Sequence, residues 1–231
     1  MHDSSDQIDF SSVLAAGVHD MKNSLCLLLQ SIESLNELVP KDAPEANENL
    51  ARLHYEASRV NTGLMQLLSL YRAEKQRLPL NIDEHVLEDV VDDIIATHEG
   101  YMHNRGLSLE VEQQDPELTW FMDADLVIVL LNDILVNAMR YCRKQIKLTT
   151  YVEDDQLCFL LEDDGDGYPE QMLKAGTADM QHFDISSGRT GLGLFFARMI
   201  ASAHQNNGVR GSIQMENGGS LGGSRFLLKL P

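Results

Sequence analysis

An apolar repeat near the N-terminus most constrains what this chain can fold into. Its members alternate in steps of four and three residues: Leu14, Val18, Met21, Leu25, Leu28, Ile32 and Leu35. This spacing puts the side chains on one stripe of an α-helix and is typical of the seam by which helices pack into a bundle. Pro40 and Pro44 then predict a turn. A second repeat of the same kind follows: Leu50, Leu53, Ala57, Val60, Leu64, Leu67 and Tyr71.

Two such helices joined by a short turn form a hairpin with an exposed apolar stripe. One hairpin cannot bury both seams, whereas two hairpins together form a four-helix bundle. We therefore predict a homodimer, with packing of the hairpin on its own C-terminal domain as the alternative. The segment Leu78-Pro79-Leu80 ends the hairpin. The expected domains are a dimerisation hairpin at 1–78 and a second domain at 79–231.

A histidine and an asparagine stand out on the first predicted helix. When Val18 lies in the seam, His19 and Asn23 point away from it, one turn apart on the same face. Asp20 lies beside the histidine. An imidazole can carry a phosphoryl group on one ring nitrogen while a neighbouring carboxylate holds the other. The alternative is an ordinary exposed histidine.

The chain is strongly acidic, with a net charge of −18 over 231 residues. Such a chain is repelled by nucleic acid and by anionic lipid, so neither is an expected partner. No run of 18 apolar residues is present and the N-terminus is acidic and polar, so we expect no membrane span, no signal peptide and a cytoplasmic location. The odd number of cysteines, Cys26, Cys142 and Cys158, predicts reduced core thiols.

The second domain shows alternating helical and strand patterns. Helices are predicted at Glu84–His98, Asp123–Tyr141 and Gly191–His204. Strands are predicted at Leu107–Val111, Ile146–Val152, Leu157–Leu161, Gly211–Met215 and Arg225–Leu230. This order indicates an α/β sandwich, with helices on one face of a mixed sheet.

The run from Asp133 to Tyr141 resembles the N-box of the GHKL ATPases, which include histidine kinases, gyrase, Hsp90 and MutL. The resemblance implies that Asn137 binds Mg²⁺ and that Asp133 acts as a base or holds Mg²⁺-bound water. An amide oxygen suits this hard cation, and a buried amide on an apolar helix would need partners. Arg140 stands where the family usually has a phosphate-contacting lysine. Tyr141 is implied to line the adenine pocket, with core packing as the alternative.

The run from Glu162 to Pro169 resembles the G1 box of the same family, Asp-x-Gly-x-Gly. The resemblance implies that Asp163 accepts a hydrogen bond from the adenine amino group. Gly165 and Gly167 would let the backbone approach the base and turn sharply. A calcium loop is an alternative, although the spacing of an EF-hand is missing. A plain turn is the other.

Two further segments resemble glycine motifs of the family. The first runs Thr190, Gly191, Leu192, Gly193, Leu194 and opens a predicted helix, as the G2 box does. Its N–H groups would face the phosphates, because a helix N-terminus attracts anions. Arg189 replaces the usual glycine there and is expected to reach the γ-phosphate. The second, Gly222 to Phe226, resembles the family's terminal Gly-Thr-x-Phe strand entry, with an ordinary turn as the alternative.

Taken together with these motifs, the segment His-Asp-x-x-Asn that begins at His19 resembles the H-box of sensor histidine kinases. The resemblance implies that His19 is autophosphorylated and that Asp20 accepts its hydrogen bond or acts as base. Asn23 would help position water for dephosphorylation of the partner. Ser24 replaces the proline common in the family, so no proline kink is expected. The resemblance extends from about Phe10 to Pro231.

The sequence thus predicts a cytosolic histidine kinase core that uses ATP and Mg²⁺ and passes phosphate to an aspartate of a response regulator receiver domain. About nine residues precede the first predicted helix, so the signal is expected from a separate sensor protein, unless the chain is cut from a longer one. One alternative is a phosphotransfer or regulatory protein that keeps the fold without kinase activity. The other is a gyrase-like ATPase in which Asp133 activates water.

Overall fold

The computed structural model describes residues 80–170, 172–173 and 191–231, together with part of the stretch 21–63. The chain divides into two compact units, Met1–Tyr71 and Arg72–Pro231. No described helix combines the length and apolar character needed to cross a membrane. The domain boundary expected between residues 78 and 79 stays a prediction.

The first unit is helical on both sides of Pro40. Every described residue from 21 to 38 and from 45 to 63 is helical, whereas Val39, Pro40 and Ala43 are not. The side-chain amide of Asn47 donates to the carbonyl oxygens of Pro40 and Ala43, at 3.1 and 3.0 Å, and so ties the second helical stretch to the residues before it. The bundle of two hairpins stays a prediction.

The second unit is built on one mixed five-stranded sheet. Its order is β2 (Ser108–Gln113), β4 (Gln145–Glu153), β5 (Gln156–Asp163), β9 (Ser224–Leu230) and β8 (Ser212–Asn217). β2 runs parallel to β4, and all other neighbours are antiparallel. The β4–β5 turn has Asp154 and Asp155 at positive φ, which permits a tight two-residue hairpin. The mixed sheet confirms the predicted fold class for this unit.

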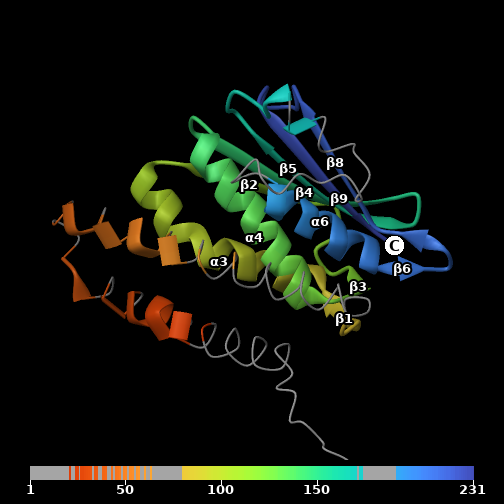
Figure 1. The fold of residues 1–231 in the computed structure, drawn as a ribbon, viewed down its shortest axis with the longest axis horizontal. Coiled ribbons are helices and arrows are strands. Elements are labelled where there is room, and N and C mark those ends of the chain that lie inside the picture. Colours follow the sequence, from red (N-terminus) through yellow and green to blue (C-terminus); the bar gives the residue numbers. More distant parts are fainter. Residues whose placement is uncertain are drawn as a thin grey trace, which may run out of the picture. The chain divides into compact units, whose positions relative to one another are not determined.

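Three helices lie together on one side of the sheet: α3 (Leu87–Arg105), α4 (Ala124–Tyr141) and α6 (Gly191–Ala203) (Figure 1). The core between helices and sheet is apolar and includes Leu131, Leu135, Met139, Phe159, Phe196, Ile200 and Phe226. Asp123 begins α4 by accepting the Leu126 N–H at 3.0 Å. This packing brings the end of α4 beside the end of β5, where the predicted nucleotide motifs meet.

The structure differs from the sequence-based prediction at Glu84–His98. The first residues of that range form a strand, β1 (Asp83–Val86), and α3 begins only at Leu87. β1 pairs with β3 (Thr119–Met122), which the pattern did not predict, and Glu84 lies opposite Phe121. The Thr119 hydroxyl also donates to the Glu84 carboxylate at 2.8 Å. This long-range pairing outweighs the local helical spacing.

Another difference is a small hairpin after α6, formed by β6 (Gln205–Asn206) and β7 (Val209–Arg210). Its turn has Asn207 and Gly208 at positive φ. Cys142 and Cys158 are free and buried, which confirms the prediction for these two thiols. Cys26 lies outside the described residues.

Candidate functional site

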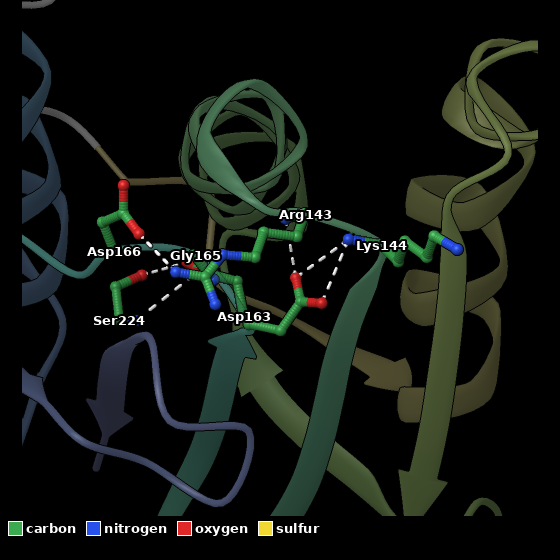
Figure 2. Close-up of polar contacts among 7 residues, drawn as sticks. Arg143, Lys144, Asp163, Gly165, Asp166 and Ser224 are labelled. Atoms are coloured by element: carbon green, nitrogen blue, oxygen red, sulfur yellow. Dashed lines mark hydrogen bonds and ion pairs between the residues drawn. The ribbon is translucent and has the colours of Figure 1, made fainter.

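The site is organised around Asp163, the last residue of β5, which is only 2% exposed. Its Oδ1 accepts the Gly165 N–H at 2.7 Å and the Ser224 N–H at 3.3 Å, and its Oδ2 accepts the Ser224 hydroxyl (Figure 2). An ionised carboxylate offers about four acceptor positions. Three are therefore used inside the protein, and one is left for a donor on a ligand. Ser224 bonds this carboxylate directly, so the segment it opens is more than an ordinary turn.

The two glycines after Asp163 are required by the close packing of this loop. A Cβ at Gly165 would lie 2.5 Å from the Tyr141 carbonyl oxygen and 2.9 Å from Asp163 Oδ1. Gly167 has φ of 80°, and a Cβ there would lie 2.7 Å from Asn217 Oδ1. No other residue type fits these two places without displacing a neighbour. Both glycines therefore allow Tyr141 and Asn217 to pack closely against the loop.

Asn217, at the end of β8, closes the loop from the far side. Its Oδ1 accepts the Tyr168 N–H at 2.7 Å, and its Nδ2 donates to the Tyr168 carbonyl at 2.9 Å. Burial raises the pKa of Tyr168 to about 12, against the opposing effect of a hydrogen bond with Ser224. The phenol is thus neutral at physiological pH.

The acidic neighbours of Asp163 point away from one another. Glu162 accepts two hydrogen bonds from the β8–β9 loop, at 2.7 and 2.8 Å. Asp164 accepts backbone N–H groups of the α4–β4 connection, and Asp166 pairs with Arg143 at 2.6 Å. Within the described part of the chain no three His, Cys, Asp or Glu residues gather as a metal site requires.

On α4, Asn137 is exposed, so the need for buried partners that an apolar helix would impose does not arise. Its Nδ2 donates to the Asp133 carbonyl one turn earlier, at 2.9 Å. The amide oxygen is the end that suits a hard cation or a bound water. The donor types of Asn137 and Asp133 fit Mg²⁺, and their role in holding it stays a prediction.

Tyr141 closes α4 and is 61% exposed, which rules out the alternative that it packs in the core. The Arg140 guanidinium lies over its ring, 5.4 Å from the centroid. The backbone carbonyl oxygen of Tyr141 occupies the space that a side chain at Gly165 would fill. An exposed aromatic ring and a cation therefore lie at the end of α4, whose last carbonyl packs against Gly165.

The other predicted site residues are placed only in part. α6 begins at Gly191 and includes Gly193, as the G2-type motif predicts, and Leu194 is 4% exposed in the core. The side chain of Leu192 is not among those described. Five predicted site residues lie outside the described residues: His19, Asp20, Asn23, Arg189 and Thr190.

Sequence reasoning did not assign a role to Ser224, Asn217 or Asp164. Ser224 and Asn217 come from strands far along the chain, and only strand pairing brings them to the loop. The one available signal was the likeness of Gly222–Phe226 to a family strand entry. Asp164 is hidden in the sequence, because it reads as one of several acids in a solvated loop.

Comparisons with known proteins agree with this geometry. Residues 122–231, 110 of the 231 in the chain, match the family model described as histidine kinase-, DNA gyrase B-, and HSP90-like ATPase. This match, with the mixed sheet and one-sided helices, confirms an ATPase-type fold for the second unit.

Over 92% of its length the chain also resembles proteins of this kind. It is 25% identical over 220 residues to the sensor protein SrrB of Staphylococcus aureus, covering 92% of this chain and 36% of SrrB. The chain thus spans about a third of the length of the curated relatives it matches. The solved structure of Acinetobacter baumannii histidine kinase AdeS is 22% identical, with a TM-score of 0.59 over 92% of this chain and 96% of that chain.

Two other solved structures share the fold. The catalytic domain of histidine kinase ThkA is 19% identical, with a TM-score of 0.55 over 66% of this chain and 96% of that chain. Full-length ShkA in complex with AMPPNP is 18% identical, with a TM-score of 0.62 over 95% of this chain and 45% of that chain.

Proposed function

We propose that this chain is the core of an ATP-dependent protein histidine kinase of a two-component system, in which residues 122–231 bind ATP and deliver phosphate to His19. The observation that carries the proposal is the Asp163 carboxylate, buried, held by Gly165 and Ser224, and left with one acceptor position. The fold that presents it is shared with solved histidine kinases.

Adenine suits this acceptor because its amino group donates, whereas guanine presents a carbonyl oxygen in the equivalent place. The missing side chains at Gly165 and Gly167 let Tyr141 and Asn217 pack closely against the loop that holds Asp163. The exposed ring of Tyr141 offers a face for stacking, and Arg140 beside it offers charge for a phosphate. ShkA, which shares the fold, was solved with AMPPNP.

The phosphates are assigned to the start of α6, where Thr190, Gly191 and Gly193 present N–H groups and Arg189 adds charge. Leu192 is assigned to the same turn, and the buried side chain of Leu194 anchors it in the core. Asn137 and Asp133 would hold Mg²⁺, which would supply the positive charge that a transferring phosphoryl group requires. The amide oxygen of Asn137 and the carboxylate of Asp133 are the hard donors that this ion prefers.

In the transfer step, a ring nitrogen of His19 attacks the γ-phosphorus of ATP. A nitrogen–phosphorus bond forms, the bond to the bridging oxygen breaks, and ADP leaves. Asp20 accepts a hydrogen bond from the other ring nitrogen or takes its proton. The phosphoryl group then passes to an aspartate carboxylate of a response regulator receiver domain. Asn23 positions water for the opposing activity, hydrolysis of the phosphoryl group on the regulator.

The homodimer is part of this proposal. The seam residues Met21, Leu28 and Leu35 are 58%, 48% and 50% exposed in the first unit. On the second helical stretch, Leu53 and Val60 are 56% and 55% exposed. An apolar stripe of this kind needs a cover, and a second copy of the hairpin supplies one of matching pattern.

The proposal also assigns the chain a place in the cytoplasm and a separate sensor as the source of its signal. The curated relatives that the chain resembles are named sensor proteins.

The experiment is a labelling assay with the full chain, γ-labelled ATP and Mg²⁺. The parent and His54→Ala, which removes another histidine of the first unit, are expected to take up an acid-labile label. His19→Ala is expected to take up none while still binding ATP. Label that persists in His19→Ala contradicts the assignment. Steady ATP hydrolysis in that variant, with no label in the parent, favours a gyrase-like ATPase.

A further inference from the structure

The connection between α4 and β4 is held by a side chain from elsewhere in the chain. α4 ends at Tyr141 and β4 begins at Gln145, so the backbone N–H groups of Arg143 and Lys144 lie between helix and sheet. Both donate to Asp164 Oδ1, at 2.8 and 3.0 Å, and Lys144 also lies 3.1 Å from Oδ2. One carboxylate thus accepts hydrogen bonds from two backbone N–H groups that lie outside both α4 and β4.

Asp164 reaches this connection because it directly follows the last residue of β5. Its own N–H continues the sheet by donating to the Gln145 carbonyl at 3.1 Å. Successive side chains of a strand point to opposite sides, so Asp163 turns to Ser224 while Asp164 turns to the connection. Burial by itself raises the pKa of Asp164, but backbone N–H groups, chiefly those of Lys144, Gln145 and Arg143, hold it below its ordinary value. The carboxylate is therefore charged at neutral pH.

The position of this connection determines the space around Gly165. The Tyr141 carbonyl stands 2.5 Å from the place of a Gly165 Cβ, and the Gly165 N–H in turn fixes Asp163 Oδ1 at 2.7 Å. Figure 2 shows Asp163, Gly165 and Ser224 gathered at the end of β5, with Arg143 and Lys144 beside them. A shift of the end of α4 would therefore press on Gly165 and turn the Asp163 carboxylate.

We infer that Asp164 is a positioning residue of the nucleotide site: by bonding Arg143 and Lys144 it locks the end of α4 against Gly165 and so fixes the acceptor direction of Asp163. The inference rests on the proposed function, because it assigns the affinity for ATP in part to a residue that need not touch ATP. The same bonds hold Tyr141 and Arg140, the exposed pair at the end of α4, in place.

The test compares ATP affinity of full-chain variants by calorimetry in Mg²⁺ buffer, with thermal unfolding recorded without nucleotide. Asp164→Ala removes both acceptors and is expected to bind ATP about tenfold more weakly than the parent. Asp164→Asn keeps an oxygen in the place of Oδ1 and is expected to stay within about threefold of the parent. This rescue by the amide separates positioning by hydrogen bonds from an effect of charge.

Two further variants complete the test. Asp166→Asn breaks an exposed ion pair of the same loop and is expected to leave affinity within about twofold. Asp164→Glu keeps the charge but shifts the oxygens, so it is expected to lose affinity, and it serves if the alanine variant does not fold. If the folded Asp164→Ala or Asp164→Glu variant binds ATP as tightly as the parent, this inference is overturned and the proposed function is left standing. A parent that binds no ATP overturns the proposed function and, with it, this inference.

Discussion

Ser224 donates both its hydroxyl and its backbone N–H to the carboxylate of Asp163, from 61 residues further along the chain. The two residues sit on neighbouring antiparallel strands, β5 and β9, at the edge where the nucleotide motifs meet. This pair holds the acceptor that the proposed function needs, and it is open to direct test.

Ser224→Ala removes one donor from a buried carboxylate. We expect unfolding free energy to fall by about 1 to 3 kcal/mol, because a buried acceptor loses a hydrogen-bond partner. Ser224→Thr keeps a hydroxyl and should retain most of that stability. Urea unfolding measures both variants, and equal losses in alanine and threonine would show that the hydroxyl does not matter.

Gly165→Ala places a methyl group against the Tyr141 carbonyl, 2.5 Å from the built position of its Cβ. Such overpacking is expected to destabilise the chain by about 1 to 3 kcal/mol and to weaken ATP binding. Gly100→Ala, on α3, is the matched control, since a Cβ there meets nothing within 4 Å. That variant should gain up to about 1 kcal/mol from helix propensity. Unfolding curves in which the two variants move in the same direction would contradict this account.

The helices and strands of the second unit were largely predictable because their patterns are local. α4 follows an apolar period that begins after the capping residue Asp123, and β4 alternates buried and less buried residues. β1 and β3 were not predictable in this way. Each has four residues, and their pairing depends on partners such as Glu84 and Phe121, which the chain brings together only when it folds.

The site was predictable to a similar extent. Asp163, Gly165 and Gly167 form a motif within five residues, so sequence shows them together. Ser224 and Asn217, which hold this motif in place, are brought to it by strand pairing. No local sequence pattern predicts their role. The exposure of Tyr141 likewise depends on where α4 ends relative to the sheet.

His204 predicts how stability responds to acid. Its Nε2 accepts the Asp123 N–H at 3.0 Å and its Nδ1 lies 2.8 Å from the Ile200 carbonyl, so both nitrogens are satisfied only in the neutral ring. Burial lowers the pKa of His204. The unfolded chain therefore takes up a proton below about pH 6.5 that the folded chain resists. The stability contributed is full above that pH and is lost as pH falls towards the lowered pKa.

Urea unfolding at about pH 7.5 and about pH 5.5 measures this effect. His103→Gln, which changes an exposed histidine of α3, should lose stability between these values as the parent does. His204→Gln should lose less. An unchanged pH response in the His204 variant would remove this histidine as the cause.

Cys142 is expected to resist alkylation. Burial raises the pKa of its thiol to about 11, with the Asp164 and Asp163 carboxylates adding to the rise. Because the thiolate is the reactive form, iodoacetamide at about pH 8 should modify Cys142 about a hundredfold more slowly in the folded protein than in the urea-unfolded chain. Peptide mapping after a timed iodoacetamide pulse gives the rates, and equal rates in both states would disprove the shielding.

The most direct measurement is the position of the phosphate after the full chain has reacted with ATP and Mg²⁺. Mass spectrometry of peptides prepared at alkaline pH locates it, since phosphohistidine is acid-labile. Our account predicts a single phosphorylated residue, His19. It also predicts that this phosphate is absent in the Asp163→Asn variant at limiting nucleotide, because that variant binds ATP more weakly. Phosphate on another residue, or an unmodified His19 in a chain that binds ATP, would contradict it.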